Sequence, residues 1–314
     1  MADILITGAN GCIGSYVVDQ LLTNSQHDLR LLVRSPDRLR EDVRTHPRVS
    51  IFVGDLETMA DFQALTCGMD AVIHVATAWG DSDYSIELNV RQTHALFDSC
   101  EPDRLRRIIY FSTASILGAG NKVVEEAGTL GTGYIRSKYL GFRSLAKSRF
   151  YDRIVTVFPT VVFGGDDRHP MSHISGGIMP NQGRIRWLRF IYPDGAFQFM
   201  HAADIAKVVQ GVLESPNPGK EVVMGGKGHT ARAAIREICD VLGIPVYFQI
   251  RVPNRFLLML ARWMRIKIHP WDRYCVTHPD FVYDAVTPET FGMASSYPTL
   301  TRVVQDIKTR WRPT

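Results

Sequence analysis

The sequence predicts an α/β fold: a doubly wound parallel sheet in the first part of the chain, with a smaller C-terminal lobe. Residues 4–6 form a short, wholly apolar run, typical of a parallel strand buried on both faces. A glycine-rich turn and a stretch with helical spacing follow at once. Further short apolar runs recur between helical stretches along the first 160 residues. Such alternation predicts parallel strands with helices packed on both faces.

Composition and charge limit the classes of protein to which this chain could belong. The chain has 314 residues, 45% of them hydrophobic and 22% charged, which is ordinary for a globular protein. The net charge of +4 is too small for a nucleic-acid-binding protein. The five cysteines are widely spaced, which predicts reduced thiols and neither a zinc site nor disulfides. We therefore expect a cytoplasmic protein with no metal, no signal peptide and no transmembrane segment.

The first turn predicts a dinucleotide site. Gly8 permits a tight turn, Gly11 a close approach to a pyrophosphate, and Gly14 close packing of the helix on the strand. The start of the following helix offers unpaired N–H groups and a partial positive charge to phosphates. An ordinary strand-to-helix turn is the alternative. The candidate contacts here are Gly8, Asn10, Gly11, Cys12, Ile13 and Gly14.

The end of the second predicted strand, residues 28–34, bears on which dinucleotide binds. An NAD site carries an acidic residue about 20 positions beyond the glycines, but this chain has Arg34. A guanidinium matches a ribose 2′-phosphate, which a carboxylate would repel. We therefore favour NADP(H) over NAD(H), with Arg34 and Arg38 as the candidate phosphate ligands. The alternative is that Arg34 is a solvated charge at the strand end.

Tyr134 and Lys138 form the sharpest catalytic signal. Residues four apart on a helix share a face, so the Lys138 ammonium is expected to lie near the Tyr134 phenol. A nearby cation lowers the pKa of a phenol from about 10. Tyr134 is thus predicted to act as a general acid–base near neutral pH.

Together, TGANGCIG at 7–14, FSTAS at 111–115, YIRSK at 134–138 and PTVVFG at 159–164 resemble the extended short-chain dehydrogenase/reductases, the NAD-dependent epimerase/dehydratase superfamily. Its members have a Rossmann sheet and a smaller substrate lobe. TGANG, the His-Val-Ala at 74–76 and Arg34 favour the branch of dihydroflavonol reductase and 3β-hydroxysteroid dehydrogenase.

The resemblance implies catalytic roles. Alignment on the family's Ser/Thr-x-x-x-Tyr-Gly pattern puts the catalytic hydroxyl at Thr113, with Ser112 and Ser115 as alternatives, although Leu117 replaces the usual tyrosine. Tyr134 would protonate the substrate alkoxide, and Lys138 would also bind the nicotinamide ribose.

It also implies further dinucleotide contacts. Asp55 would accept from the adenine amino group, or cap a helix over 57–65. The remaining candidates are Leu56 beside it, Val75, Ala76 and Thr77 after the fourth strand, and Pro159, Thr160 and Val162 after the sixth.

Three polar residues are interpreted as structural. We favour His74 as a core residue, Asn89 as a plain helical residue over one that holds a bend near the nicotinamide, and Asp204 as the N-cap of the helix that follows it.

The predicted domains are a dinucleotide-binding domain over 1–160 and a substrate lobe over 161–314, with about 198–224 returning to the first domain. The 165–195 segment is predicted to be irregular and to form part of the substrate pocket or a mobile loop. The basic amphipathic stretch 253–268 predicts either a membrane-facing or lipophilic-substrate lid, or a lobe helix whose apolar face is packed; we favour the packed helix.

The predicted function is hydride transfer between NADP(H) and a small-molecule carbonyl or alcohol, a lipophilic one included. A sugar-nucleotide epimerase or dehydratase is the alternative, although those usually carry Asp at position 34, Asn near Thr160 and Arg at position 198. A third class, a non-catalytic dinucleotide sensor, is disfavoured by the intact Tyr134/Lys138 pair. The substrate, the reaction direction, peripheral membrane contact and a homodimer stay open.

Overall fold

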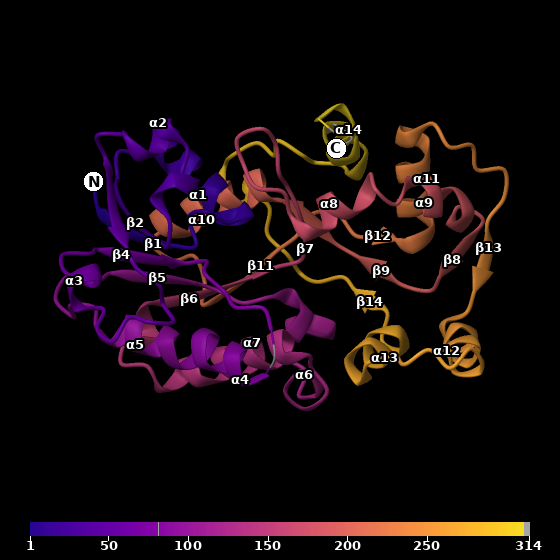
Figure 1. Ribbon diagram of the computed structural model, residues 1–314, viewed down its shortest axis with the longest axis horizontal. Coiled ribbons are helices and arrows are strands. Elements are labelled where there is room, and N and C mark those ends of the chain that lie inside the picture. The colour runs from indigo at the N-terminus through magenta and orange to yellow at the C-terminus, as the bar shows by residue number, and fades with distance from the viewer. Residues whose placement is uncertain (81, 311–314) are drawn as a thin grey trace.

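A computed structural model describes residues 1–80 and 82–310 of the chain. Its larger part is a seven-stranded parallel sheet of order β11-β6-β5-β4-β1-β2-β3, with helices on both faces (Figure 1). The predicted doubly wound fold is therefore confirmed. The strands are β1 (Asp3–Thr7), β2 (Asp28–Val33), β3 (Val49–Val53), β4 (Ala71–His74), β5 (Arg107–Phe111), β6 (Ile154–Pro159) and β11 (Glu221–Met224).

Alternate side chains of the central strands enter two separate cores. In β1, Ile4 and Ile6 pack into the cluster beneath α1 (Cys12–Asn24) and α10 (Ala202–Glu214). Leu5 enters the opposite cluster, which contains Leu65 of α3, Leu96 of α5 and the residues after α7. Because both faces of β1 are covered, Ile4, Leu5 and Ile6 are all buried, as the sequence indicated, whereas the edge strand β3 is only partly buried.

The helices on the second face differ from the prediction in two places. The expected helix over 57–65 is wrong, because only α3 (Gln63–Thr66) forms there. The helix expected around Asn89 is interrupted by a π-helical segment, η2, and such segments often mark functional sites. The elements are α2 (Glu41–Arg44), α4 (Ser82–Ile86), η2 (Glu87–Gln92), α5 (Thr93–Asp98), α6 (Glu126–Thr129) and α7 (Gly133–Ser144).

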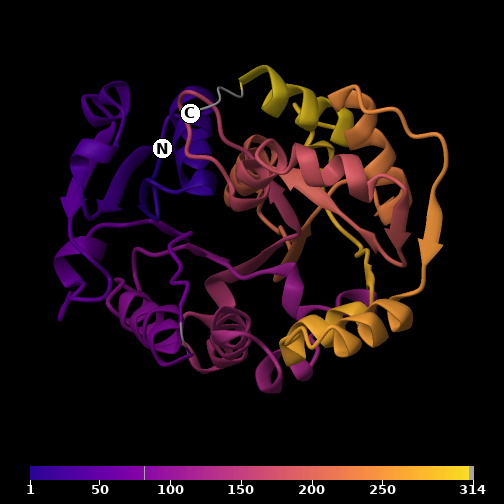
Figure 2. The same ribbon diagram turned by 45° about the vertical axis from the view of Figure 1, so that its right-hand side comes forward.

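The lobe is built from short strands and helices on the right of Figures 1 and 2. Its sheets are β7 (Val161–Phe163) with β10 (Phe199–His201), β8 (Ile191–Pro193) with β13 (Ile250–Val252), and β12 (His229–Thr230), β9 (Ala196–Phe197) and β14 (Asp280–Phe281). Its helices are α8 (His173–Ile178), α9 (Gln182–Leu188), α11 (Ala231–Leu242), α12 (Asn254–Trp263), α13 (Pro270–Thr277) and α14 (Leu300–Arg310). The 165–195 segment thus contains α8, α9 and β8, contrary to the irregular structure expected.

Helix α12 corrects our favoured interpretation of the 253–268 stretch. None of its residues is buried, and Phe256, Leu260 and Trp263 are 48%, 37% and 78% exposed. The apolar face is therefore not packed against the lobe. Among the described residues, no helix is long and apolar enough to cross a bilayer.

Candidate functional site

The glycine turn between β1 and α1 packs so closely on its neighbours that it leaves no room for side chains at two of its glycines. Gly8 has φ +76°, and a Cβ there would lie 2.7 Å from the Ala76 nitrogen. A Cβ on Gly14 would lie 2.1 Å from the Gly8 carbonyl oxygen. No described side chain caps the start of α1, whose N-cap is Gly11. The turn thus presents bare backbone at a helix N-terminus, which suits a pyrophosphate.

Asn10 supplies a second sign that this turn fits a ligand. Its Nδ2 donates to the Ser35 carbonyl at 3.3 Å, which ties the turn to the end of β2. Its Oδ1 is buried and has no hydrogen-bond partner among the described residues. A buried acceptor without a donor is costly, so this atom is suited to a donor brought by a bound molecule.

Two arginines and an aspartate lie beyond the turn. The side chain of Arg34 is 68% exposed, and its Nη1 lies 3.7 Å from Asp55 Oδ2. Arg38 lines a small cavity of about 30 Å³ with Asn10, Ser15 and Arg168. Asp55 does not cap a helix as the alternative held; its Oδ1 accepts from the Glu57 N–H at 3.1 Å. Sequence reasoning missed Arg168, which comes from the lobe and adjoins no glycine motif.

Thr113, Tyr134 and Lys138 meet at the carboxyl edge of the sheet. Thr113 follows β5, and its hydroxyl accepts from the Ser115 N–H at 3.2 Å and bonds the Tyr134 phenol. Lys138, one turn after Tyr134 on α7, is 2% exposed. Its Nζ donates to the Phe111 carbonyl at 2.8 Å, so the ammonium is fixed against the end of the same strand.

The protonation of this group differs from the expectation. Burial raises the pKa of Tyr134 to about 12, and the bond from Thr113 opposes that rise. Burial also lowers the pKa of Lys138 to about 7. Desolvation therefore sets the pKa of the phenol, only the Thr113 hydrogen bond opposes it, and the expected lowering by the Lys138 ammonium is not among its causes. Tyr134 holds its proton at neutral pH.

Trp79 covers the Tyr134 phenol, which the sequence did not indicate. The two rings are stacked with centroids 3.9 Å apart and planes 7° apart. Trp79 also meets the edge of His173, the first residue of α8, at 5.6 Å. Although stacked, Trp79 is 59% exposed, so it stands between Tyr134 and solvent. A lone tryptophan in a loop gives no sequence signal of such a contact.

Asn89 fixes the backbone that carries Trp79, which corrects its interpretation as a plain helical residue. Its Oδ1 accepts from the Ala78 N–H at 2.7 Å, and its Nδ2 donates to the Ala78 carbonyl at 3.0 Å. Nδ2 also donates to Ser137 Oγ at 2.9 Å, and Ser137 Oγ donates to the Tyr134 carbonyl. The buried amide therefore joins the Trp79 loop to helix α7.

The other candidates lie around the same edge. Ser112 is buried with its Oγ unpartnered among the described residues, whereas Ser115 is exposed. Thr160 Oγ1 donates to the Met224 carbonyl at 2.9 Å. The remaining candidates differ in exposure. Partly buried against one core cluster are Cys12, Ile13, Val75 and Val162. Two more are partly exposed, Ala76 and Leu56, whereas Thr77 is exposed and Pro159 is the last residue of β6.

His74, expected in the core, is 2% exposed. Its two ring nitrogens lie 2.9 and 3.1 Å from the Thr7 and Thr93 hydroxyls, which satisfies both. Burial lowers its pKa to about 3, so it is neutral. It is a core residue, as predicted.

Asp204 is buried, but it does not cap α10. His201 is the N-cap, with its side chain accepting from the Ala203 N–H at 3.2 Å. The Asp204 carboxylate accepts from Ser295 Oγ and from the N–H groups of Ser296 and Tyr297, at 2.6 to 2.9 Å. It therefore anchors the chain that leads to α14.

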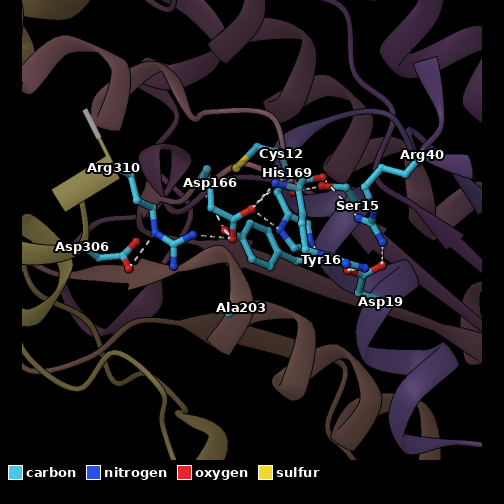
Figure 3. A network of polar contacts seen from close by, with 12 residues as sticks. Cys12, Ser15, Tyr16, Asp19, Arg40, Asp166, His169, Ala203, Asp306 and Arg310 are labelled. Atoms are coloured by element: carbon cyan, nitrogen blue, oxygen red, sulfur yellow. Dashed lines mark hydrogen bonds and ion pairs between the residues drawn. The ribbon is translucent and has the colours of Figure 1, made fainter. Parts of the chain in front are cut away.

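The segment after β7 is fastened over α1 (Figure 3). The His169 ring stacks on Tyr16 with centroids 3.6 Å apart. Its Nδ1 lies 2.8 Å from Asp166 and its Nε2 3.0 Å from Asp19, which in turn pairs with Arg40 at 2.6 Å. This network holds the start of the lobe beside the glycine turn.

Both the nitrogen and the oxygen of the Gln198 side-chain amide are hydrogen-bonded within the lobe. Its Nε2 donates to the Gly226 and Tyr283 carbonyls at 2.9 and 3.2 Å, and its Oε1 accepts from the Tyr283 N–H at 2.9 Å. The Tyr283 hydroxyl donates to the Ala114 carbonyl at 3.0 Å, so this part of the lobe packs directly behind Thr113.

Comparisons with known proteins agree with this fold. The chain is 27% identical over 137 residues to a 3-beta-hydroxysteroid dehydrogenase of Mycolicibacterium neoaurum, covering 40% of this chain and 36% of that protein. It is 24% identical over 261 residues to the uncharacterized UDP-glucose epimerase YtcB of Bacillus subtilis, covering 76% and 80%. The crystal structure of gox2253 superposes with a TM-score of 0.75 at 21% identity, covering 98% and 97%.

The model of the NAD dependent epimerase/dehydratase family matches residues 4–225, well over half of the chain. The matched region contains the glycine turn, Thr113, Tyr134, Lys138 and the strands that bring them to one edge. This chain belongs to the NAD-dependent epimerase/dehydratase family, the extended short-chain dehydrogenase/reductases.

Proposed function

We propose that the protein is an NADP(H)-dependent oxidoreductase that reduces a carbonyl compound or oxidises the corresponding alcohol. The observation that carries the proposal is the meeting of Thr113, Tyr134 and Lys138 at the carboxyl edge of the sheet. Open α/β sheets bind their ligands at this edge. The bare glycine turn and the orphaned Asn10 Oδ1 fit a dinucleotide beside it.

The chain's own residues divide the work of the reaction. When bound, the nicotinamide supplies or accepts the hydride. Tyr134, whose pKa is raised to about 12, holds a proton and gives it to the substrate oxygen as negative charge develops there. Thr113 hydrogen-bonds that oxygen, and this bond strengthens as charge accumulates. Lys138, whose Nζ is held by the Phe111 carbonyl, would bind the hydroxyls of the nicotinamide ribose.

The proposed preference for NADP(H) rests on charge. Arg34 and Arg38 are exposed at the end of β2, where guanidinium groups suit a 2′-phosphate. Asp55 lies 3.7 Å from Arg34 and is proposed to bond the adenine amino group. The neighbouring candidates, Leu56 and residues 75–77, are proposed to pack against the dinucleotide.

A sugar-nucleotide epimerase is the second candidate, because the match to an epimerase spans most of both chains. The tertiary contacts at position 198 weigh against it. Epimerases tend to carry an arginine there, whereas the nitrogen and oxygen of the Gln198 amide are hydrogen-bonded to backbone groups of the lobe. The position thus offers neither a cation nor a free donor to a nucleotide diphosphate.

The test is turnover by the wild type and Tyr134→Phe. Purified protein is incubated with NADPH and a panel of ketones and aldehydes, and separately with UDP- and dTDP-sugars. Consumption of NADPH by the wild type, lost in Tyr134→Phe while dinucleotide affinity is kept, is the expected result. Nucleotide-sugar interconversion without net NADPH consumption would instead establish the epimerase. Turnover of Tyr134→Phe within a few-fold of wild type would exclude Tyr134 as the proton donor.

A further inference from the structure

The end of the lobe farthest from the large sheet combines exposed apolar side chains with uncompensated positive charge. We call the segments 184–192 and 247–268 the lobe tip; they include most of α9, β8, β13 and α12, along the right-hand edge of Figure 1. Ile250 of β13 pairs with Ile191 of β8, and Phe248 stacks on Phe190 with centroids 4.9 Å apart. The two segments therefore form one continuous surface.

The apolar side chains of the lobe tip point outward. Of the 21 exposed large hydrophobic residues among those described, twelve lie in 187–191 and 247–266. On α12 the stripe of Phe256, Met259, Leu260 and Trp263 has the i, i+3, i+4, i+7 spacing that normally faces a core. These four are 37–78% exposed, and Trp187 and Tyr247 are 81% and 80% exposed. A concentration of this kind marks an interaction surface.

Charge is segregated to the same place. Residues 169–193 and 241–271 contain eight lysines and arginines and no aspartate or glutamate. The rest of the chain carries 28 basic against 32 acidic side chains, so the lobe tip accounts for the whole positive surplus. Arg251 pairs with Asp194 at 2.5 Å. The other seven have no carboxylate within ion-pair distance among the described residues; they are Arg184, Arg186, Arg189, Arg255, Arg262, Arg265 and Lys267.

We propose that the lobe tip binds the surface of a membrane that contains anionic lipids. Tryptophan, phenylalanine and leucine inserted beside arginines are the combination with which an amphipathic helix lies in a lipid interface. A second copy of the chain is disfavoured, because two such tips would bring like charges together. A single-stranded nucleic acid would stack on the aromatic rings, but it offers nothing to the aliphatic members Ile250, Met259 and Leu260.

This proposal does not depend on the reaction proposed above. The elements that carry the glycine turn, β1 and α1, lie on the opposite side of the molecule from β13 and α12 of the lobe tip (Figure 1).

The experiment is sedimentation of the full chain with vesicles. One set contains phosphatidylcholine alone, and the other phosphatidylcholine and phosphatidylglycerol in equal amounts. The wild type is expected to sediment with the anionic vesicles and not with the neutral ones. Each cation near an anionic surface contributes about fivefold to affinity, so Arg255→Gln/Arg262→Gln/Lys267→Gln is expected to weaken binding on the order of 100-fold.

Matched control variants distinguish a role of the lobe tip in vesicle binding from the general effect of removing charge or apolar surface. Arg106→Gln/Lys122→Gln/Lys147→Gln removes three exposed cations from the dinucleotide-binding side and is expected to bind like the wild type. Met259→Ser/Trp263→Ser should lose binding, and Leu130→Ser/Tyr151→Ser should keep it. All four residues of this pair of variants are exposed, so both proteins are expected to fold; thermal melting checks this.

Three results would overturn the proposal. The first is that folded wild type does not sediment with anionic vesicles, and the second is that the lobe-tip and control variants lose vesicle binding equally. The third is that the wild type binds neutral vesicles in a way that salt does not change. A mass change in solution abolished by Met259→Ser/Trp263→Ser, without vesicle binding, would assign the surface to a second copy. Retention on single-stranded DNA without vesicle binding would assign it to nucleic acid.

Discussion

Trp79 lies flat on Tyr134, with the ring centroids 3.9 Å apart and the planes within 7° of parallel. The contact places an exposed indole over the side chain proposed as the proton donor. It also contributes to the burial that raises the pKa of Tyr134 to about 12. A substrate oxygen that reaches the Tyr134 phenol is therefore expected to lie beside the indole.

Replacing Trp79 with alanine is expected to change substrate affinity and the pH profile together. An aromatic contact is worth about 0.5–1.5 kcal/mol, so kcat/KM for aryl ketones should fall roughly 3- to 10-fold, mainly through KM. Exposure of Tyr134 to water should lower its pKa and move the alkaline limb of the profile to lower pH. Steady-state kinetics between neutral and alkaline pH measure both. In Trp79→Phe both changes should be smaller; an unaltered profile in Trp79→Ala would contradict the covering role.

Arg34→Ala is expected to erase the preference for NADPH. A hydrogen bond to a charged group contributes about 1.5–3 kcal/mol, so the KM for NADPH should rise roughly 10- to 100-fold, while that for NADH stays within a few-fold. Arg91→Ala, which removes an exposed arginine on η2, serves as the control. Parallel losses with both dinucleotides would show that Arg34 does not recognise the 2′-phosphate.

Asn89→Leu is expected to lower kcat more than dinucleotide affinity. The substitution leaves the Ala78 N–H and carbonyl without their partner and frees the loop that carries Trp79. Each buried group left unpaired costs about 1–3 kcal/mol, so unfolding in urea should also come earlier. Asn89→Asp keeps the acceptor for Ala78 and should retain part of kcat. A variant that melts early but turns over normally would make Asn89 structural only.

Lys138 predicts a pH dependence of stability. Its pKa is about 7 in the folded protein and about 10.5 when unfolded, so the unfolded state binds more protons between these values. The contribution of Lys138 to stability therefore rises with pH from about 7 to 10.5 and is flat below 7. In Lys138→Met this rise should be missing. Urea unfolding of both proteins between pH 7 and 9 measures the difference; curves of equal slope would contradict the lowered pKa of the buried Lys138.

Asp204→Ala is expected to destabilise the protein by about 2–4 kcal/mol. Three donors from residues 295–297 lose a buried carboxylate, and they hold the chain that leads to α14. Urea unfolding monitors the change. Asp152→Ala, at a side chain 98% exposed, should have no measurable effect. Equal midpoints for the two variants would argue against the anchoring role.

Much of the fold was predictable because its signals are local. An apolar run such as 4–6, followed at once by a glycine turn, favours a strand buried on both faces, and Gly8 and Gly14 sit where any Cβ would clash. Predictions were wrong where the sequence allowed a polar side chain more than one hydrogen-bonding role. The sequence predicts a helix cap for Asp204 and offers one as the alternative role of Asp55, yet Asp55 closes a tight turn and Asp204 bonds residues some 90 positions away.

The amino-acid sequence by itself determined the doubly wound sheet, the position of the glycine turn and the pairing of Tyr134 with Lys138 on one helix, since each follows from spacing over a few residues. Only the tertiary structure decided how the site is arranged. It buried Lys138 against Phe111, raised rather than lowered the Tyr134 pKa, laid Trp79 on the phenol and left the α12 stripe facing outward. The physical reason is that desolvation and long-range contacts depend on which segments meet, and no local pattern encodes that.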